Sequence, residues 1–268
     1  MFHTIKHGTL EYLTADALEG SVHCFSTRLG GVSAGQLSSL NLGTHRGDKP
    51  ENVRENYRIL GKAVGFAPEE TVFTRQEHTD LLLRVGRADC GTGLDREQTT
   101  VCDGILTDEP GVALVCFAAD CTPVLLFDPV RQAIAAVHAG WRGTAQGIAY
   151  KAVLRMQEEF GCAPEDIRAA IGPCIGRCCF EVGPEVPDAM REALSADAEA
   201  AIEPRGEKAH VDLKLLNRIW LQKAGVQVID VSPDCTMCHP DRFWSHRVTG
   251  GARGSQAAII RLKGGAAQ

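Results

Sequence analysis

Short β-rich runs cluster in the middle of this 268-residue chain, and this clustering constrains the fold more than any other feature. Three runs follow one another closely, at 112–117, 123–127 and 133–138, and Asp128-Pro129 marks a turn between the last two. Helical patterns do not alternate strictly with the strands, as they would in a doubly wound parallel sheet. The pattern therefore predicts an α+β fold of packed layers.

The rest of the chain carries further strand and helix patterns. Additional β-rich runs are predicted at 22–26, 71–74, 81–85, 168–171, 226–231 and 257–262, and helices over about 49–63, 144–160, 187–194 and 213–224. Asp48 and Asp212 are the expected N-caps of the first and last of these helices. No internal repeat, low-complexity tract or linker interrupts the chain, so we predict one domain over residues 1–268.

The composition is that of an ordinary globular protein, with 44% hydrophobic and 23% charged residues and a formal net charge of -6. Lys and Arg are scattered, so we expect no nucleic-acid partner. The N-terminal segment lacks the pattern of a signal peptide, and no apolar stretch reaches the roughly 18 residues that a membrane span needs. We therefore predict a cytoplasmic protein without a membrane partner, whose 11 cysteines are free thiols.

A cysteine and a histidine flank the predicted turn at positions that suit a shared ligand. If Phe127 pairs with Gln132, Cys121 lies directly opposite His138 in the antiparallel pair. The Cβ atoms of directly opposed residues are about 4.5–5.5 Å apart, which suits two ligands of one metal ion or a thiol hydrogen-bonded to a base. The alternative is that His138 is an interior histidine and Cys121 a small buried hydrophobic residue.

A third metal ligand has to come from elsewhere in the chain. His78 lies in a loop between two predicted strands, although spacing alone does not select it. Two histidines and one thiolate would leave the fourth tetrahedral position of zinc open for water or substrate, as in catalytic zinc sites. This composition favours Lewis-acid or water-activating chemistry.

Two other groups of cysteines lie in the second half of the chain. Cys174, Cys178 and Cys179 are the first group, and Cys235 and Cys238 are the second. With His239, the second group matches the C-x-x-C-H motif for covalent haem attachment. Covalent haem attachment takes place outside the cytoplasm, so we do not expect it here. A structural zinc shared by the two groups requires that four ligands converge, and buried thiols remain the default interpretation.

Three arginines are candidates for binding phosphate or a carboxylate. Arg28 lies in a Gly-rich loop, Arg142 follows the second histidine by four residues, and Arg247 lies near the end of the chain. Arg142 is the best placed, because Gly143 is expected to open the next helix, whose N-terminal amides also favour anions. Asp120, beside the proposed cysteine ligand, is the candidate proton carrier.

Five segments of the chain resemble the YfiH/YlmD family. They are FSTRLGGVS at 25–33, SLNLG at 39–43, ADCTP at 119–123, HAGWRG at 138–143 and IGPCIG at 171–176. This family was long labelled polyphenol oxidase or laccase domain and is now described as purine nucleoside phosphorylase. The resemblance runs from about residue 22 to about residue 262 and implies an α/β/β/α layered fold resembling that of cytotoxic-necrotizing-factor-like cysteine hydrolases.

The resemblance also implies site residues. The metal ligands of the family map onto His78, Cys121 and His138, which we expect to be catalytic together with Asp120. Substrate contacts are expected from a second set of residues: Arg28, Asn41, Arg142 and Arg247. The implied cofactor is Zn²⁺, with copper a weaker alternative.

The activity implied is phosphorolysis of adenosine, inosine and S-methyl-5'-thioadenosine to free base and ribose 1-phosphate, with adenosine deamination beside it. In deamination, zinc-bound hydroxide would attack C6 of the purine while Asp120 moves protons. In phosphorolysis, Arg142 or Arg28 would hold phosphate near the anomeric carbon. The expected partners are thus a purine nucleoside and phosphate, and the expected state is a monomer or weak homodimer.

Two other enzyme classes remain open at this point. In a cysteine amidase or hydrolase that edits peptidoglycan precursors, Cys121 is the nucleophile and His138 its base. A thiolate locked on zinc is a poor nucleophile, so stoichiometric metal would count against this alternative. A copper polyphenol oxidase would need many histidines grouped as several metal centres, and only nine histidines occur here, mostly dispersed.

Overall fold

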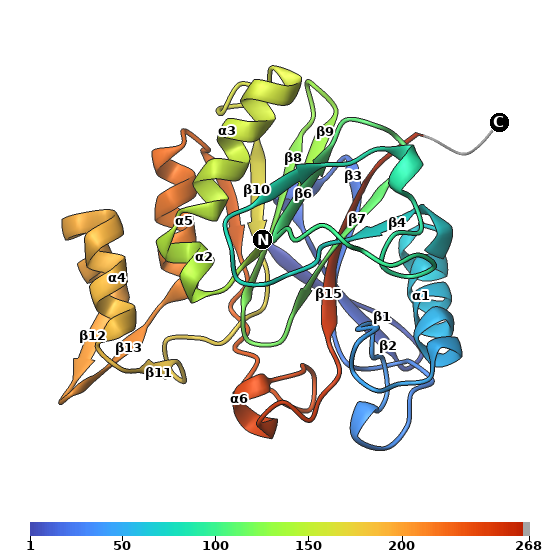
Figure 1. Ribbon diagram of the computed structural model, residues 1–268, viewed down its shortest axis with the longest axis horizontal. Coiled ribbons are helices and arrows are strands. Elements are labelled where there is room, and N and C mark those ends of the chain that lie inside the picture. The colour runs from blue at the N-terminus through green and yellow to red at the C-terminus, as the bar shows by residue number, and fades with distance from the viewer. Residues whose placement is uncertain (265–268) are drawn as a thin grey trace.

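Two six-stranded sheets pack face to face in the computed structural model, which describes residues 1–264 (Figure 1). The first sheet has the order β1-β2-β3-β15-β7-β4. Its strands are β1 (Phe2–His7), β2 (Leu10–Ala15), β3 (Ser21–Ser26), β15 (Gln256–Leu262), β7 (Ala113–Ala118) and β4 (Thr71–Phe73). All pairings in this sheet are antiparallel except that of β4 with β7.

The second sheet has the order β14-β10-β8-β9-β6-β5. Its strands are β14 (Val228–Val231), β10 (Arg168–Ile171), β8 (Thr122–Asp128), β9 (Ala133–Ala139), β6 (Gly104–Thr107) and β5 (Leu82–Arg84). A small third sheet contains β11 (Glu181–Val182), β13 (Lys208–Val211) and β12 (Ile202–Arg205). It lies beside α4 at the edge of the molecule (Figure 1).

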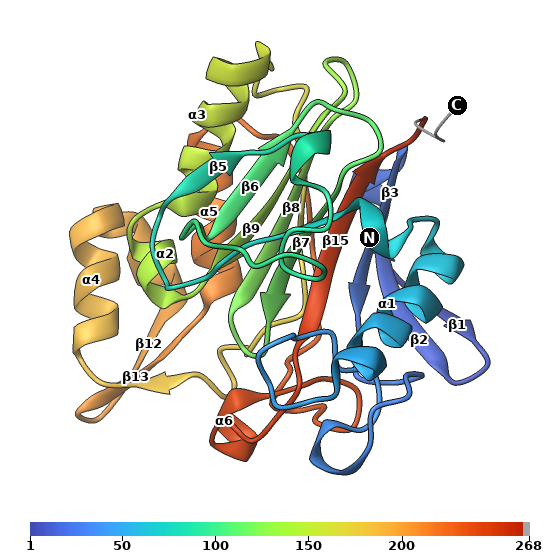
Figure 2. The same cartoon turned by 45° about the vertical axis from the view of Figure 1, so that its right-hand side comes forward.

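Helices cover the outer faces of both large sheets. The α-helices are α1 (Pro50–Val64), α2 (Trp141–Ala145), α3 (Ile148–Phe160), α4 (Glu185–Leu194), α5 (Leu213–Lys223) and α6 (His246–Thr249). Figures 1 and 2 place α1 on one side of the paired sheets and α3 with α5 on the other. This α/β/β/α order confirms the α+β layered fold expected from the sequence.

The alternation of side chains along the central strands explains the layers. In β8, Leu125 and Phe127 point into the core between the sheets, whereas Val124 and Leu126 pack toward α3. Because each central strand is buried on both faces, its sequence is almost continuously apolar. Such strands form only where layers cover both sides, and this accounts for the four-layer arrangement.

The helix α1 begins one residue later than the predicted boundary and has a different cap. Pro50 occupies its first turn, and Gly65 ends it in the left-handed conformation with φ 107°. The predicted N-cap Asp48 does not cap the helix, since Lys49 is at that position without a side-chain cap bond. The Asp48 carboxylate instead accepts hydrogen bonds from Ser33 and Asn41, so it joins the preceding loops. Asp212, in contrast, caps α5 as predicted.

The predicted hairpin forms, but its register differs from the expected one. Phe127 pairs with Ile134, and His138 with Pro123, so Cys121 does not lie directly opposite His138. The reason is the turn, in which the Asp128 carboxylate accepts the amides of residues 130 and 131 and thereby shifts the loop to 129–132. A shift of two positions in the pairing keeps the same side chains on the same face.

Other differences concern elements that lack a strong pattern. The helix expected over 144–160 is divided into α2 and α3, because Gly147 adopts φ 71° between them. Because α2 already begins at Trp141, Gly143 lies inside this helix and does not open one. The strands β1, β2, β6, β11, β12 and β13 were not expected from the sequence. The single-domain prediction extends to residue 268, and its last four residues lie outside the described ones. No helix within residues 1–264 is long and apolar enough to cross a membrane.

Candidate active site

The three predicted metal ligands converge from three different segments. His78 lies in the loop between β4 and β5, Cys121 directly precedes β8, and His138 is in β9. Their ligand atoms all lie within 4.8 Å of one another, and the two imidazole rings have centroids 5.0 Å apart. His138 is buried, Cys121 is half-buried and His78 is exposed, so the group is open on one side. The three residues form a group able to hold a metal ion.

A glycine makes the approach of His78 to this group possible. A Cβ atom on Gly140 would lie 2.4 Å from Nδ1 of His78 and 3.4 Å from Sγ of Cys121. No side chain fits at this position while His78 keeps its place. The position of His78 therefore requires a glycine at residue 140, in the segment HAGWRG.

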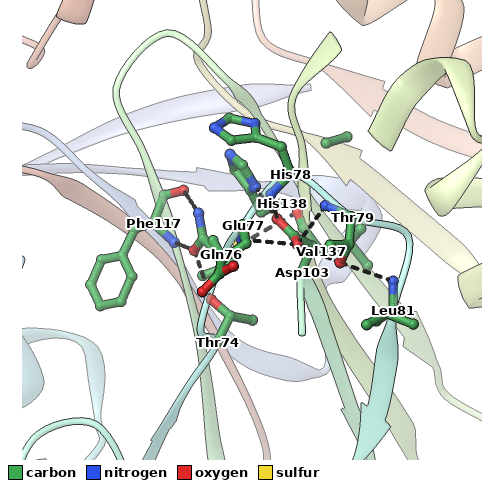
Figure 3. A network of polar contacts seen from close by, with 12 residues as sticks. Thr74, Gln76, Glu77, His78, Thr79, Leu81, Asp103, Phe117, Val137 and His138 are labelled. Atoms are coloured by element: carbon green, nitrogen blue, oxygen red, sulfur yellow. Dashed lines mark hydrogen bonds and ion pairs between the residues drawn. The ribbon is translucent and has the colours of Figure 1, made fainter. Parts of the chain in front are cut away.

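Asp103 connects the two histidines and was not found from the sequence. Its carboxylate is fully buried and accepts hydrogen bonds from the backbone amides of Glu77, His78 and Thr79, at 2.8–3.2 Å, and from the Thr79 hydroxyl (Figure 3). It also lies 2.8 Å from Nδ1 of His138. This contact directs the proton of the imidazole to Nδ1 and leaves Nε2 free for a metal ion, as in other metal sites.

The charges of this network change the protonation of both partners. Burial raises the pKa of Asp103, but hydrogen bonds from His138 and Thr79 outweigh it and lower the pKa to about 2. Burial lowers the pKa of His138, whereas the Cys121 sulfur and the Asp103 carboxylate raise it to about 9. In the metal-free protein His138 therefore retains a proton that a metal ion has to displace.

Asp120, the predicted proton carrier, joins three segments of the chain. It has φ 86°, a conformation that residues other than glycine rarely adopt. Its carboxylate accepts hydrogen bonds from the Thr236 hydroxyl at 2.6 Å, the Ser245 hydroxyl at 3.1 Å and the Arg247 amide at 2.7 Å. Because both oxygens are engaged in this way, Asp120 fixes the backbone that carries Cys121.

The three ligands line a cavity of about 500 Å³. This volume lies within the usual range for small-molecule sites, which is about 300–1,000 Å³. Phe73 and Phe117 form an aromatic wall, with their rings edge to face and centroids 5.1 Å apart. The side chain of Gln76 holds this wall in place, since it accepts from the Phe117 amide and donates to the Phe117 carbonyl oxygen (Figure 3).

Two arginines that the sequence did not indicate also line the cavity. Arg46 and Arg253 both donate hydrogen bonds to the Ser255 hydroxyl, at 3.1 and 3.3 Å. Burial and the nearby Arg46 cation lower the pKa of Arg253 to about 10. Buried Nε of Arg253 has no hydrogen-bond partner, and within residues 1–264 neither guanidinium forms an ion pair with a carboxylate. The pair thus has the chemistry of an anion site.

The predicted substrate contacts Arg28 and Asn41 do not line this cavity within the described residues. Arg28 donates to the carbonyl oxygens of residues 38 and 240 and stacks on Trp244, 3.9 Å from the ring centroid. Asn41 is fully buried, and its side-chain oxygen accepts the amides of Gly43 and Ser255. Both residues therefore shape the loops that carry the cavity wall.

Arg142 and Arg247 are exposed and also lie outside the cavity lining in the described part of the chain. Arg142 stacks on Trp141, 4.2 Å from the ring centroid. The guanidinium of Arg247 donates to the carbonyl oxygen of Glu181 at 3.0 Å. The predicted metal ligands thus lie together at the cavity, whereas none of the four predicted substrate contacts lines it within the described residues.

Comparison with known proteins gives consistent matches over most of the chain. The family model described as multi-copper polyphenol oxidoreductase laccase matches residues 22–263. The purine nucleoside phosphorylase YlmD of Geobacillus stearothermophilus is 38% identical over 92% of this chain and 92% of that protein. The purine nucleoside phosphorylase YfiH of Escherichia coli is 37% identical over 85% of this chain and 89% of that protein. The crystal structure of YlmD from Geobacillus stearothermophilus has a TM-score of 0.91 at 36% identity and covers 97% of this chain and 99% of that one.

Proposed function

Because this chain belongs to the YfiH/YlmD family of laccase-like proteins, we propose that it is a metal-dependent purine nucleoside phosphorylase. One observation carries the proposal: the ligand group His78, Cys121 and His138 shares a cavity with two guanidiniums that have no carboxylate partner within residues 1–264. Phosphorolysis needs a site for phosphate beside a site for the nucleoside, and this cavity offers both kinds of surface. The names of the relatives support the same activity.

Zinc is the metal in this proposal. Two imidazoles and one thiolate with an open fourth position match the donor set of a catalytic zinc site. When bound, the ion supplies Lewis acidity next to the cavity. A copper oxidase receives less support, because in the described residues only one of the two potential metal-binding groups contains histidine.

Arg46 and Arg253 hold the phosphate in this proposal. Guanidinium groups present planar pairs of donors that match phosphate oxygens. Arg253 is half-buried and Arg46 is exposed, and within residues 1–264 no carboxylate pairs with either and competes with phosphate. The hydroxyl of Ser255 lies between the two guanidiniums and fixes their separation. These residues replace Arg28 and Arg142, which point to other partners, in the phosphate role.

The nucleoside lies against the aromatic wall formed by Phe73 and Phe117. In the reaction, an oxygen of phosphate forms a bond to C1′ of the ribose while the bond from C1′ to N9 breaks, and the electron pair leaves with the purine. The purine nitrogen then takes up a proton. The guanidiniums orient phosphate for this attack and exclude competing water from that position.

Adenosine deamination is the second activity that we propose for the site. In this reaction water adds to C6 of adenosine and the bond from C6 to the amino nitrogen breaks, so that ammonia leaves and inosine forms. A Lewis-acid position beside the cavity suits this attack. Asp120 contributes to either reaction by holding Cys121, since both of its oxygens accept hydrogen bonds from other loops. This role differs from the proton transfer expected from the sequence.

A cysteine hydrolase is the competing candidate, and one contact favours it. The sulfur of Cys121 and an imidazole nitrogen of His138 lie within 4.8 Å of each other, the arrangement that the nucleophile and base of a cysteine hydrolase need. In a protein without metal this pair could attack an amide. Stoichiometric zinc would exclude this role, because it occupies the thiolate.

The products formed from inosine with and without phosphate test the proposed function. We expect hypoxanthine and ribose 1-phosphate in equal amounts, and only when phosphate is present. Release of free ribose would identify a nucleoside hydrolase and contradict the proposal. Absence of base release by a protein with full metal content would also contradict it.

A further inference from the structure

Four cysteines outside the active site form a second group of potential metal ligands. Cys178 and Cys179 lie in the loop between β10 and β11, and Cys235 and Cys238 lie in the loop that follows β14. All four sulfur atoms lie within 4.8 Å of one another. The Sγ atom of Cys238 is 3.6 Å from that of Cys178 and 3.4 Å from that of Cys179. The group shares no residue with the site around His138.

The backbone of the two loops is arranged around these sulfurs. Residues 174 and 235 form an isolated parallel bridge, in which the Thr236 amide donates to the Cys174 carbonyl oxygen at 3.0 Å. The Gly176 amide donates to Sγ of Cys235 at 3.1 Å. A Cβ atom on Gly176 would lie 3.1 Å from Sγ of Cys178, so a larger residue would crowd the group. A cluster of negatively charged thiolates is stabilised by amide groups that donate to sulfur, and it needs a small residue beside it. Gly176 provides both.

The dimensions of the group fit one tetrahedral ion. With a zinc–sulfur distance of about 2.3 Å, the sulfurs of a zinc tetrathiolate are about 3.8 Å apart. The separations of 3.4 and 3.6 Å lie slightly below this value, and no two of the four sulfurs are more than 4.8 Å apart. An iron–sulfur cluster would need more space, because its cysteines surround several irons and inorganic sulfides. Cys235 and Cys238 also have the C-x-x-C spacing of structural zinc sites.

We propose that Cys178, Cys179, Cys235 and Cys238 bind a second zinc ion, which is structural and has four protein ligands. The ion links two loops that both hold Asp120. The Ile175 amide donates to the Asp120 carbonyl oxygen at 3.0 Å, and the Thr236 hydroxyl donates to its carboxylate at 2.6 Å. The second zinc thereby stabilises the segment that carries the ligand Cys121. Its existence does not depend on the nucleoside activity.

Metal analysis of the wild type and three variants tests this proposal. We expect two zinc ions per chain in protein purified under reducing conditions without added chelator. The double variant Cys178→Ser/Cys238→Ser should retain about one, and so should Cys121→Ala. The matched control Cys90→Ser, which replaces a half-buried cysteine outside both groups, should retain two. One zinc in the wild type that is lost in Cys121→Ala would overturn the proposal, and so would iron in the second position.

Alkylation of the wild type keeps the test decisive if the double variant fails to fold. Cys178 and Cys238 are exposed, so without a metal they should react readily with iodoacetamide. We expect them to be protected as purified and to become reactive after removal of zinc by a chelator, as identified by peptide mass spectrometry. Reactivity without chelator, or a disulfide between two of the four, would overturn the proposal.

Discussion

Asp103 determines the orientation of both histidine ligands. Its carboxylate accepts the amides around His78 and contacts Nδ1 of His138, so it fixes one ligand through the backbone and the other through the imidazole. In the sequence it is a single aspartate before an unrecognised strand, and only the pairing of β6 with β9 brings it to His138. A carboxylate of this kind has no sequence signal of its own.

Replacement of Asp103 should weaken metal binding. In Asp103→Asn the amide cannot serve as an acceptor for all these donors, so we expect zinc affinity at the active site to fall about 10- to 100-fold. Competition with a chromogenic chelator measures the affinity. Asp108→Asn, which removes an exposed ion-pairing carboxylate, is the control. Equal affinities in the two variants would contradict the role of Asp103.

Replacement of Arg253 should change the KM for phosphate much more than the KM for inosine. Loss of charged hydrogen bonds worth about 1.5–3 kcal/mol should raise the KM for phosphate in Arg253→Ala about 10- to 100-fold, with little change in the KM for inosine. Steady-state kinetics with each substrate varied in turn measures this. Arg87→Ala, at an exposed arginine outside the cavity, is the matched control. A rise in the KM for inosine alone would place phosphate elsewhere.

The proton on His138 should make the stability of the metal-free protein depend on pH. Its pKa of about 9 in the folded state exceeds the 6.5 of an ordinary imidazole, so this proton stabilises the folded state. The stabilisation is complete below pH 6.5 and disappears as the pH rises through about 9. We therefore expect the Tm difference between chelated wild type and chelated His138→Gln to shrink over this interval. A constant difference would show that His138 has no raised pKa.

At the scale of elements, the sequence predicted what depends on local pattern. The strands at 123–127 and 133–138 were confirmed as β8 and β9, because short apolar runs and the Asp128-Pro129 turn are local signals. Their register was wrong, since it depends on how the Asp128 carboxylate folds the turn. The strands β1 and β2 were missed because neither alternates between buried and exposed positions: β1 has no buried residue, and five of the six residues of β2 are buried.

The junction of β9 with α2 allows a prediction at Gly140. This residue has φ -65°, which alanine adopts without strain, so the only effect of Gly140→Ala is the added Cβ at 2.4 Å from Nδ1 of His78. We expect loss of the active-site metal, with a thermal stability close to that of the wild type after its metal has been removed. Ala196→Ser, which adds one side-chain atom at an exposed position far from the site in the sequence, is the control. Normal metal content in Gly140→Ala would show that His78 is not held as described.

At the scale of the whole molecule, the cavity is assembled from both ends of the chain. Arg46 precedes α1, whereas Arg253 precedes β15, which inserts between β3 and β7. The Ser255 amide donates to Asn41, and this bond joins the two segments. Such a site depends on long-range strand order, which single-sequence patterns do not contain. Resemblance to a family supplied His78, but it did not supply the two cavity arginines.

The most direct test of the central claim is phosphorolysis of inosine by wild type and Cys121→Ala, each analysed for metal in the same preparation. The account predicts that the wild type forms ribose 1-phosphate and that Cys121→Ala has lost both this activity and about one equivalent of zinc. A Cys121→Ala protein that still cleaves inosine, or a wild type that is active after its metal has been removed, would contradict the account.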